Sequence, residues 1–128
     1  MFNQATPPRR ALVIDDDETM VEQLSGVLRK IGFAVEQSSD GLDALHRCQN
    51  ADFDLVVCDV RMPRLSGTSF LNNLSRTPHR IGKIIMISAL DDPAVKRQCL
   101  AAGATAYLVK PISDQTLRDV VGEAPVAR

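Results

Sequence analysis

Short apolar runs alternate with longer amphipathic stretches along the whole chain. Five of the runs have the length and the β-branched composition of strands, and they cover residues 11–14, 33–37, 55–58, 83–87 and 107–109. Each run is followed by a stretch in which apolar residues recur at helical spacing, such as Leu24, Leu28 and Ile31 after the first run. Five successive pairs of strand and helix predict an α/β fold, in which a parallel sheet is covered on both faces by right-handed crossovers.

Capping residues and glycines predict where the helices begin and end. The first helix is expected to be capped by Asp17 or Glu18, and the second by a residue of Ser39-Asp40-Gly41. The third is expected to begin near Ser66, and the last two to be capped by Asp92 and Ser113. The expected stops are Gly32, Gly103 and Gly122. The second helix is expected to turn Leu42, Leu45 and Cys48 towards the sheet. The run at residues 33–37 is only partly apolar, which favours a place at an edge of the sheet.

The composition is that of one globular domain of ordinary size. The chain has 128 residues and a formal net charge of -1, and its basic residues are scattered, so direct binding of nucleic acid is not expected. Its cysteines, Cys48, Cys58 and Cys99, lack metal-binding spacing and are expected to be reduced packing residues of a cytoplasmic protein. No apolar run approaches the roughly 20 residues that cross a bilayer, so no membrane association is expected.

The two ends of the chain differ in composition from the middle. Residues 1–10 contain Pro7 and Pro8 and lack the apolar core of a signal peptide, so a flexible N-terminal tail is expected there. The folded domain is expected to cover residues 11–122. Residues 123–128 are typical of a linker, which predicts an output domain further along a longer protein, with a stand-alone domain as the alternative.

Polar functional residues follow four of the five expected strands. Asp15 and Asp16 follow the first, Asp59 the third, Ser88 the fourth and Lys110 the fifth. Because the carboxyl ends of parallel strands meet at one edge of a sheet, these side chains are expected to form one site. Three carboxylates repel one another unless a cation lies among them, and their oxygens suit Mg²⁺, with Mn²⁺ as an alternative. Ser88 and Lys110 can bind a phosphoryl group there.

Four stretches of the sequence resemble one known family. They are Leu12 to Asp16, Asp54 to Gly67, Ile84 to Ala89 and Gly103 to Pro111. Their order is an acidic pair, a strand-end aspartate followed by Met62 and Pro63, a strand-end Ser-Ala pair, and Lys110-Pro111 after a strand with an aromatic residue. From about Ala11 to Val121 the chain resembles the receiver domain of bacterial two-component response regulators.

The resemblance implies a fold and a site. The fold would be flavodoxin-like, a (βα)5 sandwich of three layers with a five-stranded parallel sheet in the order 2-1-3-4-5. Asp59 would accept a phosphoryl group from a histidine kinase, and Asp15 and Asp16 would hold Mg²⁺ beside it. The Arg61 backbone carbonyl would complete the protein ligands of the metal, and Ser88 and Lys110 would bind the phosphoryl group. The resemblance also implies a cis peptide bond between Lys110 and Pro111.

Other residues are expected to set the lifetime and the effect of the phosphoryl group. Arg61 and Leu90 stand two residues beyond Asp59 and Ser88. The Arg61 cation can add a charge-assisted hydrogen bond to the phosphoryl group, and Leu90 offers no acid or amide that orients water, so slow loss of the phosphoryl group is expected. Ser88 and Tyr107 are expected to form the switch, with Tyr107 turning inward mainly after phosphorylation. Contacts with partners, or with a second copy in a homodimer, are expected around residues 95–100, Tyr107 and residues 114–121. The other expected partner is a cognate histidine kinase or phosphotransfer protein.

Two other function classes remain open at this point. Asp15, Asp17 and Thr19 follow an apolar strand as in the nucleophile loop of haloacid-dehalogenase-type phosphatases. Those enzymes need a further acidic strand end after the lysine, whereas Asp114 and Asp119 both lie in the expected last helix. The other class is a receiver-like interaction module that takes no phosphoryl group, against which the intact set of acidic residues speaks. We therefore expect a signalling switch rather than a metabolic enzyme.

Overall fold

Five strands and five helices alternate in the computed structural model, which describes residues 8–122. The strands are β1 (Arg10–Ile14), β2 (Ala34–Ser38), β3 (Phe53–Asp59), β4 (Ile81–Ser88) and β5 (Ala106–Val109). The helices are α1 (Glu18–Ile31), α2 (Gly41–Asn50), α3 (Gly67–Leu74), α4 (Pro93–Ala101) and α5 (Asp114–Val121). The predicted alternation is confirmed. β1 begins at Arg10, one residue earlier than expected, while residues 1–7 and 123–128 of the expected tail and linker lie outside the described part.

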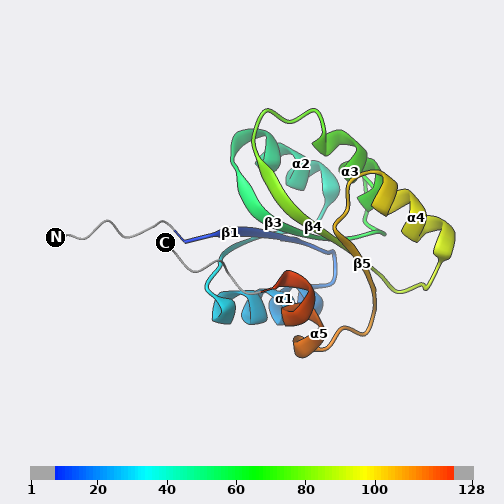
Figure 1. Cartoon of the computed structure of the whole chain (residues 1–128). Coiled ribbons are helices and arrows are strands. Elements are labelled where there is room, and N and C mark those ends of the chain that lie inside the picture. Colours follow the sequence, from blue (N-terminus) through cyan, green and yellow to red (C-terminus); the bar gives the residue numbers. More distant parts are fainter. Residues whose placement is uncertain (1–7, 123–128) are drawn as a thin grey trace.

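The strands form one parallel sheet in the order β2-β1-β3-β4-β5. Figure 1 shows the sheet as the middle of three layers, with α1 and α5 on one face and α2, α3 and α4 on the other. This is the flavodoxin-like architecture that the resemblance implied, and β2 lies at an edge as its weak apolar pattern predicted. Among residues 8–122, no helix is both long enough and apolar enough to cross a bilayer.

The central strand β3 is buried on both faces. Leu55 and Val57 pack in the core on the side of α1 and α5, whereas Val56 and Cys58 pack in the core beneath α2, α3 and α4. Each large apolar side chain buried in this way contributes about 1.5–3 kcal/mol to stability. Two covered faces explain why the strand appears in the sequence as an unbroken apolar run.

The three cysteines are free and buried, as predicted. They all lie in the core beneath α2, α3 and α4. Burial raises the pKa of the Cys48 thiol to about 12, so this side chain stays protonated at neutral pH and has no thiolate for metal binding or oxidation.

The predicted helix caps are confirmed. Asp17, Asp40, Ser66, Asp92 and Ser113 are the N-caps of α1 to α5, and each side chain accepts a hydrogen bond from a backbone N–H of the first helical turn. Gly32 ends α1 with a φ of 117°, a conformation that favours glycine. These caps satisfy helix ends that would otherwise leave backbone donors without partners.

One predicted core position is wrong. Leu42 is 48% exposed, whereas Cys48 is fully buried and Leu45 packs at the margin of the core. The buried residues of α2 are Gly41, Ala44 and Cys48, which recur at intervals of three and four residues. Leu42 follows Gly41 by one residue and is therefore rotated by about 100° away from this buried stripe.

Candidate functional site

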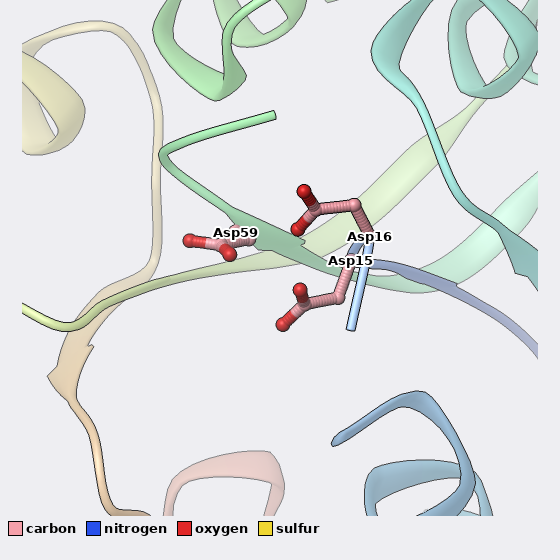
Figure 2. A group of neighbouring side chains, drawn as sticks. All are labelled: Asp15, Asp16 and Asp59. Atoms are coloured by element: carbon pink, nitrogen blue, oxygen red, sulfur yellow. The ribbon is translucent and has the colours of Figure 1, made fainter. Parts of the chain in front are cut away.

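Three carboxylates meet where β1 and β3 end. The two strands pair with Ile14 opposite Cys58, so the next residues, Asp15 and Asp59, lie side by side. One oxygen from each of Asp15, Asp16 and Asp59 lies within 4.8 Å of the others. Figure 2 shows the three side chains in the same space beyond the strand ends. Asp15 is 1% and Asp59 6% exposed, while Asp16 is open to solvent.

Lys110 binds two of these carboxylates at once. Its Nζ donates to Asp15 Oδ2 and to Asp59 Oδ2, each at 3.1 Å. The other oxygens accept backbone hydrogen bonds, Asp15 Oδ1 from Asp17 N–H at 3.0 Å and Asp59 Oδ1 from Arg61 N–H at 3.2 Å. The two buried aspartates are thus held in fixed orientations and share one cation.

Burial and crowding change the acidity of this group. Burial raises the pKa of the Asp15 carboxyl, and the negative charge of Asp59 adds to this, against the opposing hydrogen bonds from Asp17 and Lys110. Asp15 therefore stabilises the fold most below its ordinary pKa of 3.8, and this contribution is lost as the pH rises through the raised value. Burial lowers the pKa of Lys110, but hydrogen bonds to Asp15 and Asp59 outweigh it and the net pKa is raised. The lysine thus stays charged at neutral pH.

The donor set fits a hard divalent cation. Three carboxylates carry more negative charge than one ammonium can balance, and a group of oxygen ligands with one member in solvent is what Mg²⁺ or Mn²⁺ binds. Asp15, Asp16 and Asp59 would hold such an ion together with the Arg61 carbonyl. A cation there would offset the cost of keeping buried Asp15 ionised at neutral pH.

The loop after Asp59 passes close to the strand from which it leaves. Gly67 N–H donates to the Val60 carbonyl at 2.8 Å, which closes the loop. A Cβ at Gly67 would overlap with the Asp59 carbonyl oxygen, so any larger residue would push the loop away from the end of β3. The glycine that marked a turn in the sequence is thus required for a close backbone approach.

Ser88 and Tyr107 are both bonded to the backbone of Leu90. Ser88 Oγ accepts from Leu90 N–H at 3.1 Å, and Tyr107 Oη donates to the Leu90 carbonyl at 2.9 Å. Tyr107 is 8% exposed and therefore inward in this structure. The relative populations of its inward and outward arrangements stay a prediction.

The structure brings most of the predicted site residues together. Asp15, Asp16, Asp59 and Lys110 form one group, and Ser88 lies at the same edge because its carbonyl accepts from Lys110 N–H at 2.8 Å. The Lys110–Pro111 bond is cis, as expected. The bonds of Leu90 to Ser88 and Tyr107 were missed, because nothing in a local pattern shows which backbone groups a distant side chain reaches.

The phosphatase alternative does not fit this arrangement. Asp17 Oδ1 accepts from the N–H groups of Thr19 and Met20 and caps α1, so it is occupied as a helix cap. Asp59, for which that alternative has no use, is one of the three members of the carboxylate group. Asp114 and Asp119 both lie in α5, as expected, and neither follows the end of a strand.

Comparison with known proteins identifies the family to which the chain belongs. A family model described as the response regulator receiver domain matches residues 11–122. The gliding motility regulatory protein of Myxococcus xanthus is 40% identical over 103 residues, which are 79% of this chain and 13% of that protein. Response regulator MprA of Mycobacterium sp. (strain KMS) is 38% identical over 110 residues, 86% of this chain and 47% of that protein. The chain thus spans less than half the length of these relatives.

Solved structures agree with the sequence relatives. A response regulator of Burkholderia pseudomallei with a phosphorylated aspartic acid, calcium ion and citrate has a TM-score of 0.81 at 25% identity, covering 89% of this chain and 66% of that one. Chemotaxis response regulator CheY4 of Vibrio cholerae has a TM-score of 0.77 at 30% identity, covering 88% of this chain and 95% of that one. With a family model that matches residues 11–122 and a sheet of the same order, the chain belongs to the response regulator receiver domain family.

Proposed function

We propose that Asp59 accepts a phosphoryl group in a reaction that depends on Mg²⁺, and that the phosphoryl group changes the surface formed by α4, β5 and α5. The observation that carries the proposal is the position of Asp59. It is a buried carboxylate at the end of the central strand, within reach of two further carboxylates and hydrogen-bonded to Lys110. The phosphorylated aspartic acid in the Burkholderia pseudomallei structure supports the same chemistry here.

The proposed donor is the phosphohistidine of a cognate histidine kinase or of a phosphotransfer protein. An oxygen of Asp59 forms a bond to phosphorus as the bond from phosphorus to the imidazole nitrogen breaks. The Arg61 N–H and the Lys110 ammonium orient the Asp59 carboxylate. The positive charge of Lys110 can also stabilise the negative charge of the transferred phosphoryl oxygens. A bound Mg²⁺ would supply further neutralisation of phosphoryl charge.

The first prediction concerns the acceptor residue. With acetyl phosphate and Mg²⁺, the wild type should gain the mass of one phosphoryl group, and Asp59→Asn should gain none because the nucleophile is lost. Asp15→Asn should react more slowly, because the metal site loses a ligand. Intact mass spectrometry measures the adduct, and Asp17→Asn serves as a control that changes a neighbouring carboxylate outside the site.

Two outcomes of the labelling would contradict the proposal. An adduct that persists in Asp59→Asn and disappears only in Asp15→Asn would show that Asp15, and not Asp59, is the nucleophile. A folded wild type without any adduct would make the chain an interaction module.

The phosphoryl group is proposed to signal through the backbone of Leu90. A phosphoryl oxygen gives the Ser88 O–H a charged acceptor, and movement of the side chain towards it would draw Oγ, and with it Leu90 N–H, towards the phosphoryl group. Since the Leu90 carbonyl accepts from Tyr107, movement of this residue changes the position of the ring beside α4. Phosphorylation shifts this equilibrium only by its different affinity for the two arrangements.

The second prediction tests this connection. Phosphorylated Ser88→Ala and Tyr107→Phe should keep the phosphoryl group on Asp59 but show smaller shifts of backbone amide NMR signals in residues 95–100 and 114–121 than the wild type. Tyr107→Phe retains the ring and loses only the hydroxyl that reaches Leu90. Shifts of wild-type size in both variants would show that the proposed path carries no signal.

The third prediction concerns the lifetime of the phosphoryl group. Leu90 is 48% exposed and apolar, so it cannot orient the attacking water, and Arg61 is exposed beside Asp59. The double variant Arg61→Asn with Leu90→Glu should lose its phosphoryl group about tenfold faster, because it supplies groups that orient water. Decay of the intact-mass adduct gives the rate, and Leu100→Glu, at a similarly exposed leucine in α4, is the matched control. Decay at the wild-type rate, or slower, would refute the role of the pair.

The surface of α4, β5 and α5 is proposed to contact an output domain, a partner or a second copy of the chain in a homodimer. Leu100 and Val109 expose apolar side chains there, at 41% and 38%. Relatives in which a matching segment is only part of a longer protein support an output domain. We propose a cytoplasmic location, as suits a partner of histidine kinases. In this proposal the chain acts as a switch with slow self-dephosphorylation, not as a metabolic enzyme.

A further inference from the structure

We propose that the ion pair between Asp40 and Arg64 positions the loop after β3 for binding of the divalent cation, so that Asp40 is a positioning residue for the metal site. We name this pair the loop latch. The inference rests on the proposed function, because it concerns the same metal site. It assigns a task to two residues that lie outside the carboxylate group.

Arg64 adopts a backbone conformation that needs support. Its φ is 70°, the only positive value among the non-glycine residues that the structure describes. Leu65 N–H donates to the Pro63 carbonyl at 2.8 Å, which closes a three-residue turn with Arg64 at its centre. A side chain with a Cβ rarely takes this conformation unless its surroundings hold it there.

Asp40 supplies that support from a fixed position. Its Oδ2 accepts a hydrogen bond from the Arg64 guanidinium, and its Oδ1 accepts from Asp43 N–H at 2.8 Å as the N-cap of α2. The pKa of Asp40 is lowered, first by the hydrogen bond from Asp43 and then by the one from Arg64, so it is ionised at neutral pH. The helix cap thus anchors the loop latch.

A second contact joins α2 to the same loop. Gly41 packs against the Leu65 backbone so closely that a Cβ would overlap with the Leu65 carbonyl oxygen. The loop between Asp59 and α3 is therefore held at Gly67 by the strand and at Arg64 and Leu65 by α2.

Arg61 lies in the same loop, between Val60, whose carbonyl binds Gly67 N–H, and Arg64, whose side chain binds Asp40. The Arg61 N–H binds Asp59 Oδ1, and the Arg61 carbonyl is the proposed metal ligand. The other side of Asp40 leads to the acidic pair, because Ser38 Oγ donates to the Asp40 carbonyl at 2.9 Å and the Ser38 carbonyl accepts from Asp15 N–H at 3.1 Å. The loop latch therefore sets the distance between the acidic pair, Asp15 and Asp16, and the loop that carries Arg61.

Simple electrostatics and the loop latch predict opposite effects for one variant. Arg64→Ala removes a positive charge near an acidic site, which by charge alone would strengthen binding of Mg²⁺. If the loop latch positions Arg61, the same variant weakens binding. The Arg64 side chain is 63% exposed and its ion pair is screened, so the expected weakening is about two- to fivefold.

The test is calorimetric measurement of the Mg²⁺ dissociation constant of the unphosphorylated protein. Asp40→Asn, which keeps an Oδ1 acceptor for the helix cap, and Arg64→Ala should each weaken binding about two- to fivefold, and the double variant no further. Asp92→Asn is the matched control, since Asp92 caps α4 without an ion pair to the loop, and it should bind as the wild type does. At saturating Mg²⁺, labelling by acetyl phosphate should return to the wild-type rate in every variant.

The outcomes separate this inference from the proposed function. Unchanged or tighter binding by Arg64→Ala, or equal weakening by Asp92→Asn, overturns the loop latch while leaving phosphorylation of Asp59 intact. A labelling rate that stays low at saturating Mg²⁺ also overturns it, because the defect then lies outside metal binding. A wild type that binds no Mg²⁺ overturns both the proposed function and the loop latch.

Discussion

The site depends on one ammonium shared between two buried carboxylates. Lys110 contacts Asp15 and Asp59 at the same distance, and Asp16 adds a third negative charge within the same group. This arrangement is only partly neutralised, which is why we propose that a divalent cation joins it and that positive charge accompanies the phosphoryl group. The fold accepts this local repulsion because the strands beneath are buried in two apolar cores. Burial of the two faces of the sheet thus stabilises the fold, and the polar residues at the strand ends are not needed for its core.

The parallel sheet explains how distant residues reach one site. Asp15, Asp59, Ser88 and Lys110 are separated by long helical crossovers, yet each stands where its strand ends. Such an edge places side chains from distant parts of the sequence within hydrogen-bonding reach of one another. Near this edge the two hydrogen bonds of the Leu90 backbone connect Ser88 with Tyr107.

Much of this could be predicted from local patterns. Apolar runs, capping residues and glycines predicted the strands and the helix ends, and the parallel arrangement predicted that the strand-end residues meet. The position of Leu42 was wrong because a short helix gives few residues from which to place its buried stripe. The pair of Asp40 and Arg64 was not predictable, since it depends on how α2 packs against a loop 24 residues away in sequence. The sheet order and the cis bond at Pro111 came from the family resemblance and not from local chemistry.

The crowded carboxylates are expected to oppose folding until a cation joins them. Thermal unfolding followed by circular dichroism at neutral pH, with and without Mg²⁺, tests it most directly on the wild type and Asp15→Asn. The raised pKa of Asp15 means that its ionised form costs stability at neutral pH. Without Mg²⁺, Asp15→Asn should therefore unfold at a higher temperature than the wild type, and Mg²⁺ should raise the midpoint of the wild type more than that of the variant. A wild type that is the more stable protein without Mg²⁺ and does not respond to the ion would contradict the account.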